Sequence, residues 1–192
     1  MTAAVFLGYA SFTNACDKYL IKAPKTPQSG SFCYDGSMKL RYLVIPLVTV
    51  LVAVVGSRFT SVGLESWYAT IKKPAWTPPG SVIGAVWTTI FILSTASALI
   101  LWNTAAAKAR LPLLATVFLL NAALNVAWSW LFFVQHRLTL AGWEAVLLDL
   151  SCIALVVLAW PLSRLAAALL VPYAAWVAFA TYLTFTIARM NR

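Results

Sequence analysis

Charged residues are scarce in this chain of 192 residues, since Asp, Glu, Lys and Arg together make up 10% of it. Hydrophobic residues, in contrast, account for 62%. A water-soluble domain usually carries about 25% charged residues to cover its surface. The composition therefore excludes an ordinary soluble domain and indicates an integral membrane protein.

Acidic residues, histidine and cysteine are rare as well. The chain has five Asp and Glu in total, three cysteines and a single histidine, His136, which is expected to be solvated. No His or Cys spacing suits a metal ion, and no nucleophile motif occurs. We expect no metal, no required cofactor, and ligand binding in preference to catalysis. Cys152 is expected to be a small core residue, whereas Cys16 and Cys33 either pair in an oxidising compartment or stay free.

Basic residues outnumber acidic ones by 14 to 5, but they stand singly or in pairs at the ends of apolar runs. Without a basic stripe for phosphates to follow, this pattern excludes nucleic acid as a partner. Anchoring at anionic lipid headgroups explains the distribution better.

Continuous apolar runs predict an all-α bundle of five membrane-spanning helices, at residues 42–57, 82–103, 111–133, 139–160 and 165–187. Crossing a bilayer core of about 30 Å takes about 20 helical residues. The first run is the shortest. Because the later connections are short, consecutive helices are expected to be antiparallel neighbours. Residues 1–37 form a predicted flexible extension, and residues 38–192 form the transmembrane domain.

The connection after the first span is rich in rigid and aromatic residues. Proline fixes the backbone, and Trp and Tyr favour the headgroup level of a bilayer. We expect a rigid lid loop over the mouth of a site, with the lysines able to reach acidic groups of a ligand there. The lid residues are Trp67, Tyr68, Lys72, Lys73, Pro74, Trp76, Pro78 and Pro79.

Asp149 falls near the middle of the fourth span, where a carboxylate costs about 2.5 to 3.5 kcal/mol. It is therefore expected to face the interior with a partner, either as structural glue or in a ligand or proton role. The third span offers the likeliest partners, since Asn121, Asn125, Trp128 and Phe132 lie on one helical face. These residues form either a pocket wall or interhelical hydrogen bonds.

The second and fifth spans carry similar faces. The second has Trp87, Phe91, Ser94 and Thr95, and the fifth has Pro172, Trp176, Ala180 and Thr184. Such stripes are often packing surfaces, but rings, small residues and amides together suit a cavity for a flat, apolar ligand. Gly80 and Gly84 fit either a close helix pair or the turn into the second span.

Several motifs follow one another in a distinctive order. They are Trp67-Tyr68, Lys73-Pro74-x-Trp76-x-Pro78-Pro79, Trp87, Asn121-x3-Asn125-x2-Trp128-Ser129, Asp149 and Pro172-Tyr173-x2-Trp176-x2-Phe179-Ala180-Thr181. From about residue 40 to the end, the chain resembles the TspO/MBR family. Members are called tryptophan-rich sensory proteins in bacteria, and translocator protein or peripheral benzodiazepine receptor in mitochondria.

The resemblance implies a multi-pass membrane receptor, often homodimeric, that binds or transports porphyrins such as protoporphyrin IX, with sterols and benzodiazepine-type compounds as further ligands. A bacterial envelope membrane is favoured over the mitochondrial outer membrane. The family's sterol-recognition segment fits poorly, because Phe185 stands where it needs Tyr. The implied ligand-binding residues are Tyr68, Trp87, Phe91, Asn121, Asn125, Trp128, Asp149, Trp176 and Ala180.

Two alternatives belong to other classes. The first alternative is a light- and oxygen-dependent enzyme that degrades protoporphyrin, because tryptophan can carry radical chemistry without any motif. A purely structural partner in a membrane complex is the other.

Overall fold

A computed structural model describes residues 36–192, with side chains from residue 40 onward. The predicted extension, apart from its last two residues, lies outside the described residues, as do Cys16 and Cys33.

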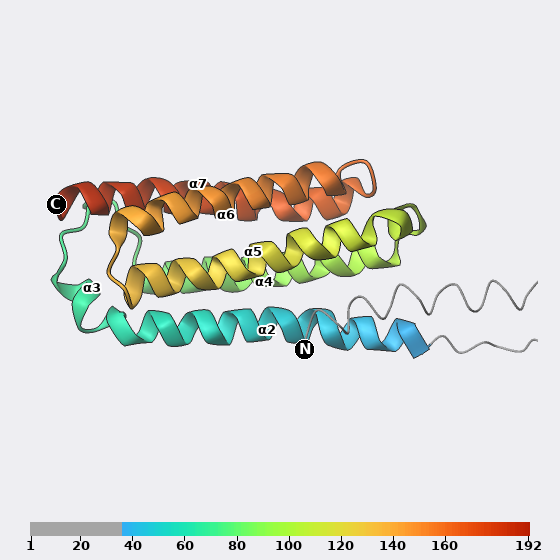
Figure 1. The fold of residues 1–192 in the computed structure, drawn as a ribbon, viewed down its shortest axis with the longest axis horizontal. Helices are drawn as coiled ribbons and strands as arrows, with labels where there is room; N and C mark the ends of the chain where they lie inside the picture. The colour runs from blue at the N-terminus through green and yellow to red at the C-terminus, as the bar shows by residue number, and fades with distance from the viewer. Residues whose placement is uncertain (1–35) are drawn as a thin grey trace, which may run out of the picture.

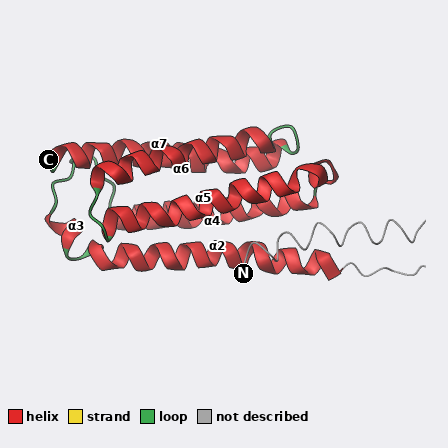
Figure 2. Ribbon diagram, in the orientation of Figure 1, coloured by secondary structure: helices red, strands yellow, loops and turns green. Residues whose placement is uncertain are grey.

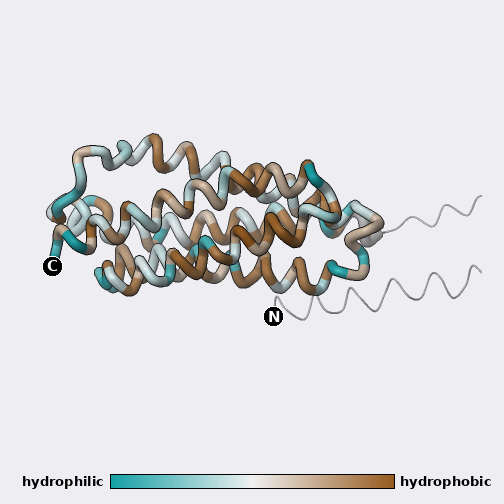
Figure 3. The backbone as a smooth tube through the Cα atoms, turned by 90° about the horizontal axis from the view of Figure 1, so that it is seen from above, coloured by the Kyte–Doolittle hydropathy of each residue, from teal (hydrophilic) through white to brown (hydrophobic). Residues whose placement is uncertain are grey.

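The described part of the chain is all-helical (Figures 1 and 2). Five of its helices are long and apolar enough to cross a membrane. The elements are α2 (Gly36–Leu64), the short α3 (Trp67–Thr70), α4 (Gly80–Asn103), the 3₁₀ helix η2 (Ala105–Arg110), α5 (Leu111–Phe133), α6 (Leu138–Ala159) and α7 (Arg164–Met190). The predicted fold class is therefore confirmed. In Figure 3 the strongly hydrophilic segments gather towards the two ends of the bundle, as a bilayer requires.

The first span differs from its prediction, because α2 has 29 residues and is the longest helix, not the shortest. Its polar residues after Gly56 do not end the helix. The Thr60 hydroxyl donates to the carbonyl oxygen of Gly56 at 2.9 Å, and the Ser61 hydroxyl donates to that of Arg58 at 2.9 Å. Hydroxyls that bond to the preceding turn are compatible with a continuing helix.

The five long helices form a closed ring in the order α2, α5, α6, α7, α4 and back to α2. Consecutive helices are neighbours for α5, α6 and α7, as predicted. For α4 and α5 the prediction is wrong, since these two do not pack along their lengths. The six residues of η2 carry the chain across this gap, which about 2 Å of rise per residue makes possible.

The ring is tightly packed at the η2 end. Leu101, Leu114 and Leu155 are completely buried there among small residues of α6 and α7. The buried Ser97 hydroxyl of α4 also donates to the carbonyl oxygen of Ala166 on α7 at 2.8 Å. The opposite end, which carries α3 and the C-terminus (Figure 1), holds the cavity described next.

Candidate ligand-binding cavity

A cavity of about 540 Å³ lies inside the ring beneath α3, and we call it the main cavity. Its walls come from all five long helices, with α6 contributing only Ala145 and Leu148. Pockets for drug-sized ligands typically measure about 300–1,000 Å³. The space therefore suits one sizeable organic molecule.

Seven of the nine predicted ligand-binding residues converge on this cavity, together with Pro78 of the lid. They are Tyr68, Pro78, Trp87, Phe91, Asn125, Trp128, Trp176 and Ala180. Trp128 lies against Phe132 with a ring-centroid distance of 5.1 Å and an interplanar angle of 22°. Trp87 meets Phe91 at 5.7 Å and 34°. Flat ring faces thus form much of the wall, while the part of these residues in binding stays a prediction.

Asn121 and Asp149 do not line the main cavity. The Asn121 amide donates to Ser151 Oγ at 2.8 Å and to Cys152 Sγ at 3.3 Å, both on α6. It therefore does not serve as the partner expected for Asp149, whose Oδ1 is buried without a partner among the described residues. Cys152 is buried, as predicted.

Tyr173 is a central polar residue that our sequence analysis did not place at the site. Its hydroxyl donates to Asn121 Oδ1 at 2.9 Å and accepts from Asn125 Nδ2 at 3.2 Å. The sequence did contain a signal for Tyr173, because a phenol inside an apolar span needs a polar partner. The prediction that Asn121 and Asn125 make hydrogen bonds between helices is thus correct. Asn125 lines the main cavity as well.

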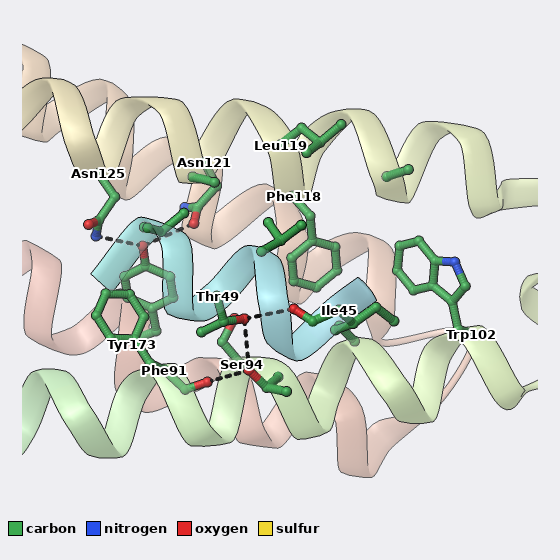
Figure 4. A pocket seen from close by; sticks show the side chains of 16 residues that line it. Ile45, Thr49, Phe91, Ser94, Trp102, Phe118, Leu119, Asn121, Asn125 and Tyr173 are labelled. Atoms are coloured by element: carbon green, nitrogen blue, oxygen red, sulfur yellow. Dashed lines mark hydrogen bonds between the residues drawn. The ribbon is translucent and has the colours of Figure 1, made fainter. Parts of the chain in front are cut away.

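A second, smaller cavity of about 80 Å³ lies between α2, α4 and α5 (Figure 4). Val52, Phe91 and Asn125 line both cavities. Tyr173 closes the smaller one from α7. Phe91 and the Asn125–Tyr173 pair therefore form the partition between the two spaces.

Two indole donors lack partners near the main cavity. Nε1 of Trp128 and Nε1 of Trp176 are both buried and make no hydrogen bond within the described residues. A buried polar group without a partner costs about 1–3 kcal/mol. Neither nitrogen is exposed to the cavity, so a ligand that brings an acceptor would recover that cost only after the indole rings turn.

The lid is fixed by aromatic contacts at three points. Trp67 stacks on His136 at 4.2 Å and 14°, so the exposed histidine is a docking partner and not merely solvated. Tyr68 packs on Phe132 and Phe133 at 6.0 and 5.7 Å. Further along, Trp76 stacks on Tyr182 of α7 at 5.5 Å and 16°.

Hydrogen bonds fasten the lid as well. The Lys72 N–H donates to Asn191 Oδ1 at 2.9 Å, and Asn191 Nδ2 donates to the Lys72 carbonyl oxygen at 2.8 Å. The Lys73 ammonium donates to the Tyr68 carbonyl oxygen at 2.7 Å and lies 4.4 Å from the centre of the Tyr68 ring. Lys73 thus holds the lid together instead of pointing at the cavity.

Of the predicted lid residues, only Tyr68 and Pro78 line the main cavity. The others lie outside it, namely Trp67, Lys72, Lys73, Pro74, Trp76 and Pro79. Burial of the Tyr68 phenol raises its pKa above the ordinary value, because an apolar setting disfavours the phenolate.

Glycines place α2 close to α5. A Cβ on Gly63 would collide with the backbone oxygen of Phe133, and one on Gly56 would lie 3.6 Å from Ser129 Oγ. In contrast, a Cβ on Gly80 or Gly84 would meet nothing within 4 Å. The prediction that Gly80 and Gly84 allow a close approach of another helix is therefore wrong within this chain. Gly80 begins α4, as the turn reading expects.

These features define a multi-pass helical membrane protein with an internal, aromatic-walled cavity beneath a fastened loop. The chain belongs to the TspO/MBR family, whose model matches residues 44–190. Over 127 residues it is 40% identical to the "Uncharacterized membrane protein YtaB" of Bacillus subtilis, which covers 66% of this chain and 81% of that relative.

Two further relatives carry informative names. The "Tryptophan-rich protein TspO" of Bacillus cereus is 39% identical over 127 residues, covering 66% of this chain and 82% of the relative. The human "Translocator protein" is 38% identical over 143 residues, covering 71% of this chain and 82% of the relative. The aligned part of each relative is thus most of its length.

Proposed function

We propose that this protein is a membrane receptor that binds a flat, mostly apolar tetrapyrrole such as protoporphyrin IX in the main cavity. The observation that carries the proposal is the convergence of Trp87, Trp128 and Trp176 from three helices on one space of about 540 Å³. Large aromatic faces are suited to stacking against a flat conjugated ring.

The same cavity wall also contains hydrogen-bond donors for the acidic groups of the ligand. Protoporphyrin carries two propionates, and each needs hydrogen-bond donors when it leaves water. The buried Nε1 groups of Trp128 and Trp176 are two donors without partners in the described chain. Charge-assisted hydrogen bonds of this kind are stronger than neutral ones.

The test is quenching of tryptophan fluorescence by protoporphyrin IX with purified protein in lipid nanodiscs. We expect the double variant Trp87→Ala, Trp176→Ala to lose affinity by at least about tenfold, since each lost ring removes buried aromatic contact. Trp160→Ala is the matched control, because Trp160 is 54% exposed and lies outside the cavity. Equal affinity in the double variant and the control would contradict the proposal.

The enzymatic alternative is separated by a second measurement. Protein and protoporphyrin IX are incubated in light with oxygen, and the absorbance is followed. A receptor leaves the porphyrin spectrum unchanged after correction for photobleaching in free solution. Protein-dependent formation of a bilin-like absorbance that Trp128→Phe abolishes would favour the enzyme.

A further inference from the structure

The main cavity has an exposed flank that is not covered by the lid. Among its lining residues, those that are exposed all lie on α2 or α4: Ser57, Ser61 and Leu64 on α2, and Gly80, Gly84 and Thr88 on α4. The lining residues of α3, α5, α6 and α7 are buried or half-buried. The cavity therefore opens sideways, between these two helices.

In the described structure, hydrogen bonds join the two helices only between the η2 end and the middle of the bundle. Arg41 Nη1 of α2 donates to the Trp102 carbonyl oxygen of α4 at 2.9 Å. Nearer the middle, the hydroxyls of Thr49 and Thr95 share a hydrogen bond of 2.9 Å. Beyond this pair, no hydrogen bond between α2 and α4 is present up to the lid within the described residues.

The lid half of α2 leans on α5 instead. Gly63 and Gly56 allow α2 to approach the backbone of Phe133 and the side chain of Ser129. On the facing side of the opening, Gly80 and Gly84 leave space where other residues would place a side chain. Glycines thus both draw α2 away from α4 and keep the gap unfilled.

The depth of the opening places it against acyl chains. Thr88 lies eight residues into α4, which is about 12 Å along the axis at 1.5 Å per residue. Exposed valines also occur on the two helices, Val62 of α2 at 65% and Val82 of α4 at 46%. Because α4 is a candidate membrane span of 24 residues, an opening at this depth lies within the hydrocarbon core and faces lipid.

We infer that the ligand exchanges between the main cavity and the bilayer through this lateral portal, formed by Ser57 and Ser61 of α2 and by Gly84 and Thr88 of α4. The lid stays closed during exchange, held by Asn191 and by the stacking of Trp67 and Trp76. The portal admits flat, apolar molecules that are dissolved in the membrane. This inference rests on the proposed function, since it needs a ligand in the main cavity.

Exchange kinetics test the portal. Protein in nanodiscs is loaded with protoporphyrin IX and mixed with an excess of phosphatidylcholine vesicles, and the return of tryptophan fluorescence gives the dissociation rate constant. Association is measured in the reverse direction, from loaded vesicles. Gly84→Leu on α4 and Ser61→Leu on α2 place bulk in the gap from opposite sides, and Gly84→Ala is the small control.

We expect both leucine variants to slow association and dissociation by about tenfold, because passage then requires an overpacked gap. Because Ser61 and Gly84 also line the main cavity, the deciding measurement is the dissociation rate constant: a blocked portal lowers it, whereas weaker binding alone raises it. Asn191→Ala, which releases the Lys72 clasp, leaves both rates unchanged.

Three results would overturn the inference. One is faster exchange in Asn191→Ala with no effect of either leucine variant, which makes the lid the gate. Another is weaker equilibrium binding in the leucine variants at an unchanged association rate, which makes the gap part of the binding wall. The third is no binding by the unaltered protein, and it alone also rejects the proposed function.

Discussion

The hydroxyl of Tyr173 on α7 donates to Asn121 Oδ1 on α5 at 2.9 Å, so one bond joins two helices across the middle of the bundle. Asn121 passes the connection on to Ser151 and Cys152 of α6. The bundle is thus crossed by a polar network between its packed end and its hollow end.

Tyr173→Phe removes the network's central hydroxyl and leaves Asn121 Oδ1 without a donor. We expect a loss of about 1 to 2 kcal/mol in stability, measured as a lower thermal unfolding midpoint in detergent. Tyr182→Phe is the matched control on the same helix, because Tyr182 is 65% exposed and keeps its ring stack on Trp76. Equal midpoints for both variants would count against a stabilising network.

Trp128→Phe and Trp176→Phe keep an aromatic ring but remove the indole N–H. If these donors bind propionates, each variant loses about tenfold in affinity for protoporphyrin IX, the effect of one hydrogen bond to a charged group. For the neutral dimethyl ester of the same porphyrin, the two variants lose less affinity. Trp160→Phe serves as the control, and the same loss for acid and ester would show that ring shape alone decides.

Phe91→Ala opens the partition between the main and the smaller cavity. We expect weaker binding of protoporphyrin IX, which loses a ring contact, and relatively stronger binding of a porphyrin that carries one long alkyl substituent, which gains access to the smaller space. Competition titrations give the ratio of the two affinities. Phe118→Ala widens only the smaller cavity, so a similar change of ratio there would contradict the role of Phe91.

Gly63→Ala forces a Cβ onto the backbone oxygen of Phe133. Because backbone yields less readily than a side chain, we expect destabilisation by about 1 to 3 kcal/mol, typical of overpacking. Gly84→Ala has open space around its Cβ and is expected to be neutral or to stabilise α4 by up to about 1 kcal/mol. Thermal unfolding of both proteins in the same detergent checks this contrast.

Alkaline pH is expected to loosen the lid through Tyr68. Folding raises the pKa of this phenol above its ordinary value of 10.0, so the docked lid is favoured below that pH. This contribution disappears as the pH rises through the folded pKa. Faster proteolysis of the lid loop above about pH 10, absent in Tyr68→Phe, would report the effect.

Local patterns predicted the parts of this protein that depend on one helix at a time. Runs of apolar residues gave α4 to α7 within a few residues, and spacings of three and four placed Trp128, Trp176 and Ala180 on faces that line the main cavity. These faces follow from helical periodicity alone.

Relations between distant segments were not predictable in the same way. The separation of α4 from α5 depends on how η2 crosses the gap, and the importance of Gly63 depends on the position of the Phe133 backbone. Asn191 gives no local hint that it clasps Lys72, which lies 119 residues earlier. Each of these features requires the packed ring and not a single helix.

A bundle with fully buried leucines at one end and a hollow at the other has a built-in gradient of stiffness. The packed cluster contains residues of α4, η2, α5, α6 and α7 but none of α2 among the described residues, so this stiffness does not extend to α2. Near the lid, α2 instead meets the Phe133 backbone at Gly63. We therefore expect the backbone order parameters of α2 to be highest around Gly63.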